Sequence, residues 1–217
     1  MIGLIFKDIL TLKKNLKMVG IVSVMYAAMS FVSKDSSFFS SIFTMLFAFL
    51  ILSAYSYDEV AKWDSYALTL PVSRENIVQG KYIIMLLMGF AGALISTVFT
   101  IVLNAVQRPD TLLVGSSAVG IGAVIVLLFY SITIPIITKL GVEKARMIFL
   151  SVYIVPFIIF FFLGNAIKNG KVVIPSALVR FGEIFLTNVY LIVPIVIILA
   201  LSISYQVSVS IYNKKEF

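Results

Sequence analysis

The chain has 217 residues, of which 61% are hydrophobic and 12% charged, whereas about a quarter of the residues in a soluble domain are charged. It contains neither cysteine nor histidine, which excludes disulfides and thiol chemistry and removes the commonest general base and metal ligand. The net charge of +7 needs no nucleic-acid partner, because basic residues that flank membrane spans explain it. The composition predicts an all-α integral membrane protein, since a bilayer accommodates the apolar excess in helices of about 20 residues.

Six apolar stretches are predicted to cross the bilayer, because an ionised side chain near the centre of a span costs about 2.5 to 3.5 kcal/mol. These spans are residues 17–33, 37–57, 82–107, 112–138, 146–164 and 184–212. Ahead of them, apolar residues at helical spacing predict an amphipathic helix over residues 1–16 in the cytoplasmic interface. A simple cytoplasmic extension of the first span is the alternative. A cleaved signal peptide is disfavoured, because the segment before this short span is longer than a usual leader region.

The distribution of basic residues predicts the orientation of these spans. With the N-terminus inside, 12 of the 17 Lys and Arg residues lie in cytoplasmic segments, as the positive-inside rule requires. Both termini are therefore predicted to be cytoplasmic. The long outer segment, residues 164–183, is either a short helix in the outer leaflet or a solvated loop. Five basic residues fall outside: Lys34, Arg108, Lys168, Lys171 and Arg180.

The cytoplasmic segment of residues 58–81 holds seven charged residues and the only tryptophan. Pro71 ends the first half, because its ring clashes with a preceding helical turn. Ser73 is placed to N-cap a second helix that continues into the third span, with Glu75 in its first turn. An apolar edge in the first half predicts a short amphipathic helix there, formed by Val60, Trp63, Ala67 and Leu70.

Four short motifs in and beside this segment carry a resemblance to a known family. They are Tyr57-Asp58-Glu59, Lys62-Trp63-Asp64, Leu70-Pro71-Val72-Ser73-Arg74 and Lys81-Tyr82. The segment resembles the first cytoplasmic loop of type-2 ABC transporter (ABC-2) permeases, the six-span subunits of ATP-driven exporters. Within them it is most similar to a small bacterial branch that includes the permeases exporting phenol-soluble modulins, which are amphipathic peptides. The six-span layout, the interfacial helix and the long outer segment fit the same family.

The resemblance implies that this loop contains a coupling helix that sits in a cleft of an ATPase subunit. Trp63, Tyr66 and Leu70 would be apolar anchors of the kind that dominate interfaces, and Pro71 would form the corner after them. Asp64 and Arg74 would set orientation through charged contacts. The alternative is that Trp63 belongs to an interfacial aromatic belt and that Arg74 and Lys81 only fix topology.

The resemblance also implies partners and a location. The chain would be no enzyme and would hold no cofactor, because Gly80-Lys81-Tyr82 lacks the rest of a phosphate-binding loop. ATP and Mg²⁺ would belong to a separate nucleotide-binding ATPase subunit. The chain would form a homodimer, or a heterodimer with a related permease, in the lipid bilayer of the bacterial plasma membrane. Its cargo would be an amphipathic peptide or another hydrophobic molecule, and the residues lining the pathway stay unassigned.

Three other functions compete with export. A secondary transporter needs ionisable groups near the midplane, and the interiors of the six predicted spans contain none. An intramembrane protease would need a Ser-Lys pair at depth, and no Lys lies there. A non-transporting scaffold subunit remains open, and it predicts that changes at Trp63 and Arg74 leave ATP hydrolysis by a partner untouched.

Overall fold

The structure, a computed structural model, describes residues 2–33, 36–107, 116–145, 147–148, 162 and 187–215. Within these residues the chain is helical and contains no strand, which confirms the predicted all-α class for this part of the chain. The helices are α1 (Ile2–Ser33), α2 (Ser36–Val60), α3 (Trp63–Ala67), α4 (Arg74–Gln107), α5 (Ser116–Leu140) and α8 (Val189–Lys214).

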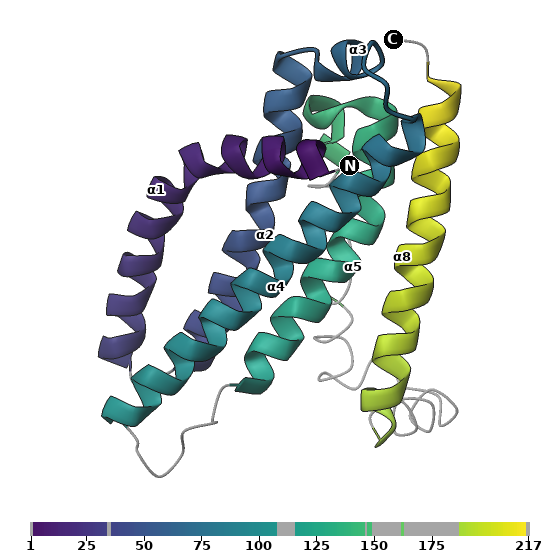
Figure 1. The fold of residues 1–217 in the computed structure, drawn as a ribbon. Coiled ribbons are helices and arrows are strands. Elements are labelled where there is room, and N and C mark those ends of the chain that lie inside the picture. Colours follow the sequence, from purple (N-terminus) through teal and green to yellow (C-terminus); the bar gives the residue numbers. More distant parts are fainter. Residues whose placement is uncertain are drawn as a thin grey trace.

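The long helices α1, α2, α4, α5 and α8 form a bundle (Figure 1). Helix α2 packs against α1, α4 and α5, and α8 packs against α4 and α5. The first part of α1 runs across the bundle, and its remainder turns to run alongside it (Figure 1). The predicted interfacial helix and first span are therefore one continuous, bent helix. The short α3 and both ends of the described chain lie toward the same end of the bundle.

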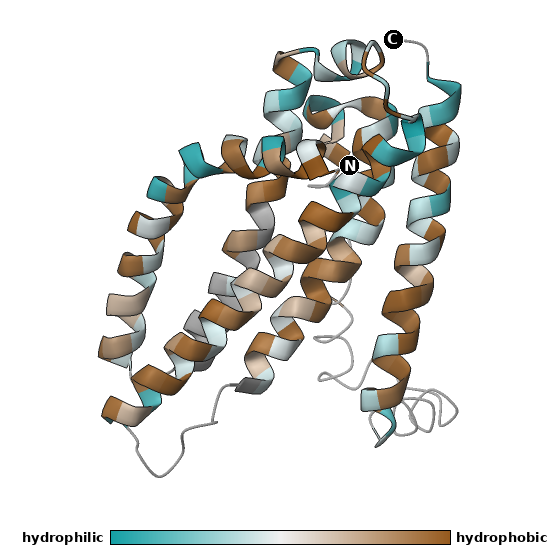
Figure 2. Ribbon diagram, viewed as in Figure 1, coloured by the Kyte–Doolittle hydropathy of each residue, from teal (hydrophilic) through white to brown (hydrophobic). Residues whose placement is uncertain are grey.

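Four of the described helices are long and apolar enough to cross a membrane: Ile2–Ser33, Arg74–Gln107, Ser117–Leu140 and Val189–Lys214. Many of their large apolar side chains face outward, as on Val24, Phe90, Val98 and Leu191, which is the arrangement that lipid favours. Figure 2 shows hydrophobic residues along the bundle and more hydrophilic ones near α3. The protein is thus a multi-pass membrane protein. The predicted fifth span and outer segment lie almost entirely outside the described residues.

The largest buried cluster lies at the end of the bundle that carries α3. It joins five helices through Ile51, Ala67, Ile77, Val78, Tyr82, Met85, Val126, Tyr130, Ile134 and Tyr212. A second cluster joins α1 to α2 and α4 through Leu12, Leu50, Ala54 and Ile84. The segment predicted to couple to a partner is therefore packed onto the protein's most extensive described core.

The predicted amphipathic helix before Pro71 is shorter than expected. Helix α2 continues to Val60, Lys62 then takes a left-handed backbone conformation with φ of 49°, and only Trp63–Ala67 is helical after it. Val60 and Ala67 do not share a buried edge, because Val60 is 85% exposed and Ala67 fully buried. The single helix predicted from apolar spacing is wrong at this point, because a turn at Lys62 interrupts it.

Candidate functional site

The site is what we call the corner, residues 58–81, which comprises the end of α2, the turns and α3 that follow it, and the start of α4. After α3 the chain leaves the helix through turns in which Leu70 N–H donates to Ala67 O at 3.2 Å and Val72 N–H to Leu70 O at 2.7 Å. Helix α4 then begins with the predicted cap, since Asn76 N–H donates to Ser73 Oγ at 3.2 Å. As predicted, α4 continues from this cap without interruption into the membrane-spanning stretch. Any movement of the corner therefore reaches the start of a spanning helix directly.

Trp63 faces the protein interior more than solvent. It is half-buried and packs on the largest core cluster, with its ring 5.5 Å from that of Tyr66. The Lys7 ammonium lies 4.3 Å from the centroid of the Trp63 ring, which is within the range of a cation–π interaction. Trp63 thus connects α3 to the first part of α1.

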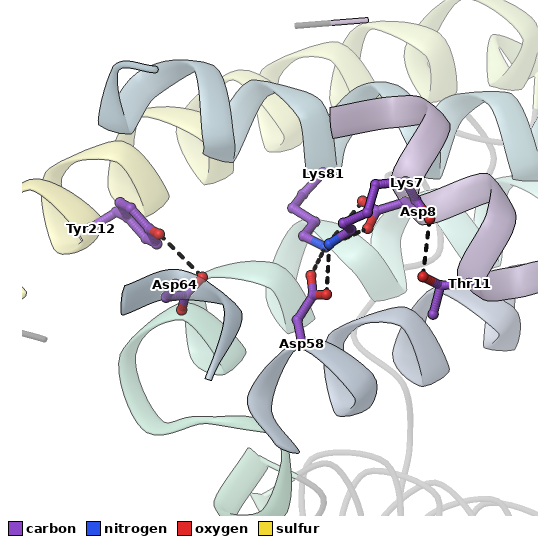
Figure 3. Close-up of polar contacts among 7 residues, drawn as sticks. All are labelled: Lys7, Asp8, Thr11, Asp58, Asp64, Lys81 and Tyr212. Atoms are coloured by element: carbon purple, nitrogen blue, oxygen red, sulfur yellow. Dashed lines mark hydrogen bonds and ion pairs between the residues drawn. The ribbon is translucent and has the colours of Figure 1, made fainter. Parts of the chain in front are cut away.

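Asp64 and Arg74 also use their polar groups within the chain. Tyr212 donates a hydrogen bond to Asp64 at 3.1 Å (Figure 3). One guanidinium nitrogen of Arg74 donates to the carbonyls of Tyr212, Asn213 and Lys215 at 3.1, 2.6 and 3.1 Å. The last carbonyls of a helix lack partners within it and attract cations, so Arg74 caps the C-terminal end of α8. Within the described residues, Asp64 and Arg74 tie α3 and α4 to α8, and their predicted role in orienting a partner stays a prediction.

Of the remaining predicted residues, Tyr66 is 57% exposed, Pro71 is exposed and Leu70 is half-buried. Together with Ser65 and Thr69, which are also exposed, they form what we call the outer face of the corner. Of the six predicted site residues, three therefore lie on or beside this face, while Trp63, Asp64 and Arg74 support it from within.

A cluster of four charged side chains lies where the two ends of the corner meet α1 (Figure 3). We call Lys7, Asp8, Asp58 and Lys81 the charge cluster. Asp58 accepts from Lys7 at 2.6 Å through one oxygen and from Lys81 through the other. Asp8 lies 2.8 Å from Lys7 and 3.0 Å from Lys81. Asp8 and Lys81 are only 3% and 7% exposed, so their charges are compensated by each other rather than by water.

Sequence reasoning did not identify this charge cluster. Two of its pairs, Lys7–Asp58 and Asp8–Lys81, join residues 51 and 73 positions apart, and Lys81–Asp58 joins residues 23 positions apart. One signal was present: Asp8 shares a helical face with the apolar Ile5 and Leu12, and a carboxylate on a buried face requires a partner. Burying an ion costs several kcal/mol unless it is paired and hydrogen-bonded. The two lysines and two aspartates together make the charge cluster neutral.

A second carboxylate of the corner contacts the chain after α5. Glu59 accepts a hydrogen bond from Val142 N–H at 2.5 Å, at the start of the helical residues 142–145. Gly141 has φ of 81°, and a Cβ placed there would come within 2.6 Å of the Glu59 carboxylate. Lys215 also donates to Thr138 O at 3.1 Å. The ends of α2, α5 and α8 are thus joined around the corner.

These groups surround a cavity of about 110 Å³. Its polar lining comprises Tyr55, Asp58, Glu59, Asp64, Lys81, Thr138, Tyr212 and Lys215. Among the described residues, no group of three or more His, Cys, Asp or Glu side chains is arranged to hold a metal ion. The described geometry is that of a joint between helix ends made of paired charges, caps and packed aromatic rings.

The family comparison agrees with the resemblance noted in the corner. A family model described as "ABC-2 family transporter protein" matches residues 3–213 of the chain. No curated protein and no solved structure matches the chain.

Proposed function

The chain belongs to the ABC-2 family of transporter proteins, and on that premise we propose that it is the permease subunit of an ATP-driven exporter. Membership over residues 3–213 is the observation that carries this proposal, because it spans the bundle and the corner together. The family's members are membrane components of ABC transporters, which implies an ABC ATPase as partner. In this proposal, a separate subunit binds and hydrolyses ATP.

The ATPase docks on the outer face of the corner. Tyr66 and Leu70 supply apolar contact there and Pro71 shapes the turn, while Trp63, Asp64 and Arg74 hold this surface in place from behind. Exposed aromatic residues are the usual anchors of interfaces. The direct continuity of the corner with α4 supports a mechanical role, because a push on α3 is delivered to a helix long enough to span the membrane.

The complete permease has six spans and works as a dimer, with itself or with a related permease, around a central pathway. Helix α2, with 25 residues, supplies a further span, and residues 146–164 supply another. Both termini lie in the cytoplasm of a bacterial cell, and the protein resides in the plasma membrane. The 12 of 17 Lys and Arg residues that fall in the predicted cytoplasmic segments support this orientation under the positive-inside rule.

The cargo is an amphipathic or hydrophobic molecule, with short amphipathic peptides such as phenol-soluble modulins as the first choice. No Lys, Arg, Asp or Glu lies in the interiors of the predicted spans, residues 17–33, 37–57, 82–107, 112–138, 146–164 and 184–212. An ion-driven transporter needs such groups at depth, whereas a permease driven by an external ATPase does not. This contrast favours ATP-driven export over secondary transport.

Co-purification tests the docking surface. We expect the affinity-tagged chain to retain the ABC ATPase encoded beside it, and Tyr66→Ala to reduce the retained ATPase about tenfold, the loss typical of an exposed aromatic anchor. Tyr190→Ala is the matched control, because Tyr190 is 89% exposed and lies near the start of α8, far along that helix from the corner. Equal ATPase retention by both variants would remove the outer face from the docking site.

Transport by the reconstituted complex tests the cargo class. Inside-out vesicles that contain the permease and its ATPase should accumulate a fluorescently labelled amphipathic helical peptide when ATP is supplied. A scrambled peptide of the same composition but low amphipathicity is the control. ATPase binding without ATP-dependent uptake of either peptide would point to a scaffold subunit or to another cargo.

A further inference from the structure

The charge cluster joins three helices, α1, α2 and α4, through side-chain contacts. Lys7 and Asp8 come from α1, Asp58 from the end of α2, and Lys81 from the start of α4. The two oxygens of Asp58 each take a different lysine, Lys7 at 2.6 Å and Lys81, and Asp8 contacts the same two lysines. Two positive and two negative charges thus form a closed, neutral set.

Lys7 extends this connection to α3. Its ammonium reaches Asp58 of α2 and also lies 4.3 Å from the centroid of the Trp63 ring. Lys81 similarly lies 5.0 Å from the centroid of the Tyr55 ring on α2. Ion pairs and cation–π contacts are most effective where they are shielded from water. The two lysines therefore link α1, α2, α3 and α4.

We propose that the charge cluster positions the corner for energy coupling, with Lys7 as the residue that joins α3 to the first part of α1. Displacement of α3 by the ATPase then moves α1 and α4 together instead of bending the corner alone. This proposal rests on the proposed function for its final step. The positioning itself belongs to the isolated permease and is measurable without a partner.

The spatial claim has a test that needs neither ATPase nor cargo. The chain contains no cysteine, so Lys14→Cys on α1 and Ser65→Cys on α3 provide two exposed sites for spin labels. Pulsed dipolar spectroscopy should give a narrow distance distribution for the parent chain. Lys7→Met, which keeps most of the side-chain length but removes the charge, should broaden or shift that distribution.

Two further variants separate the charge cluster from general effects of lysine removal. Lys13→Met is the matched control, because Lys13 is an exposed lysine on the same helix and should leave the distribution unchanged. Lys7→Arg keeps the positive charge and the cation–π contact and should restore a narrow distribution. An unchanged distribution in Lys7→Met, or equal broadening in Lys13→Met, would overturn the positioning role.

The coupling claim is tested with the reconstituted complex at equal amounts of bound ATPase. Lys7→Met should lower the amount of labelled amphipathic peptide transported per ATP hydrolysed on the order of fivefold or more, as typical couplings between sites do. Lys7→Arg should restore the ratio, and Lys13→Met should match the parent. An unchanged ratio in Lys7→Met would overturn the coupling role.

A paired variant keeps the test informative if a single change at a buried position prevents folding. Asp8→Asn with Lys81→Met removes one positive and one negative charge, which is better tolerated than leaving a buried ion alone. It should fold, yet loosen α1 from α4 and lower the transport per ATP. Failure of the parent complex to bind ATPase or move peptide would refute the proposed function, while the spectroscopic result would still decide the positioning role.

Discussion

At the scale of single residues, the corner depends on charged groups whose roles their sequence positions did not reveal. Arg74 follows a Pro-Val-Ser turn and resembles a residue poised to meet a partner. In the structure its guanidinium donates to three backbone carbonyls at the end of α8, those of Tyr212, Asn213 and Lys215. Asp64 likewise accepts from Tyr212, which lies 148 residues away. Both residues hold the shape of the corner, and in the proposed function they act on docking through that shape.

Arg74→Met should therefore lower the stability of the isolated permease. Hydrogen bonds to charged groups contribute about 1.5 to 3 kcal/mol each at most, and Arg74 is only half-buried, so we expect a loss of about 1 to 2 kcal/mol. Thermal unfolding in detergent micelles measures it. Lys214→Met, an exposed change at the same helix end, is the control.

The two roles of Arg74 have different signatures. A helix cap predicts a lower unfolding temperature before any partner is added, with a partial recovery in Arg74→Lys because the ammonium retains the charge but not the planar donor geometry. A direct ATPase contact predicts an unchanged unfolding temperature and weaker ATPase binding. The second result would return Arg74 to the docking surface.

At the scale of elements, α2 and α4 approach each other closely at one glycine. A Cβ built on Gly92 would lie 2.6 Å from the Cβ of Phe47 and 3.5 Å from Thr44 O. Gly89, one turn earlier on α4, has no atom within 4 Å of the equivalent position. Small residues permit this kind of close approach between membrane helices. Among the described residues, Gly92 makes such an approach and Gly89 does not.

Gly92→Ala and Gly89→Ala form a matched pair of predictions. Overpacking should make Gly92→Ala less stable by about 1 to 3 kcal/mol. Gly89→Ala should be neutral or slightly stabilising, because alanine favours a helix over glycine by up to about 1 kcal/mol. Unfolding in detergent measures both variants. Equal effects would mean that Gly92 is not the contact that sets the separation of α2 and α4.

At the scale of the whole molecule, the helix ends near the corner hold the bundle together by exchanging caps and charges. Arg74 of α4 caps α8, Lys215 after α8 binds the carbonyl of Thr138 in α5, and Glu59 of α2 binds the chain after α5. These contacts all lie toward one end of the bundle, which is the end proposed to face the cytoplasm. At the opposite end, among the described residues, Gln107 of α4 donates a hydrogen bond to Phe31 O of α1 at 3.0 Å.

Cysteine labelling tests the proposed orientation of the whole molecule in a chain that has no natural cysteine. In intact cells, a membrane-impermeant maleimide should label Asp35→Cys, which the six-span topology places outside. It should reach Ser65→Cys only after the membrane is permeabilised. Protection of Asp35→Cys in intact cells would remove the short first span from the topology.

The sequence by itself determined the class of protein, the apolar helices, the cap of α4 at Ser73 and the family. These features are written locally, in composition, in hydropathy over about 20 residues and in residues a few positions apart. Family motifs are also contiguous, so the four motifs around the corner were readable without a fold.

Only the tertiary structure decided what the corner's charges do. The contact of Lys7 with Trp63, the capping role of Arg74 and two pairs of the charge cluster join residues 51 to 141 positions apart. The interruption of the helix at Lys62 also appears only in the structure. Helical periodicity shows which face of a helix is buried but not which helix covers it. The identity of an ionic partner follows from that covering helix, and so it emerged only when α1, α4 and α8 were placed around the corner.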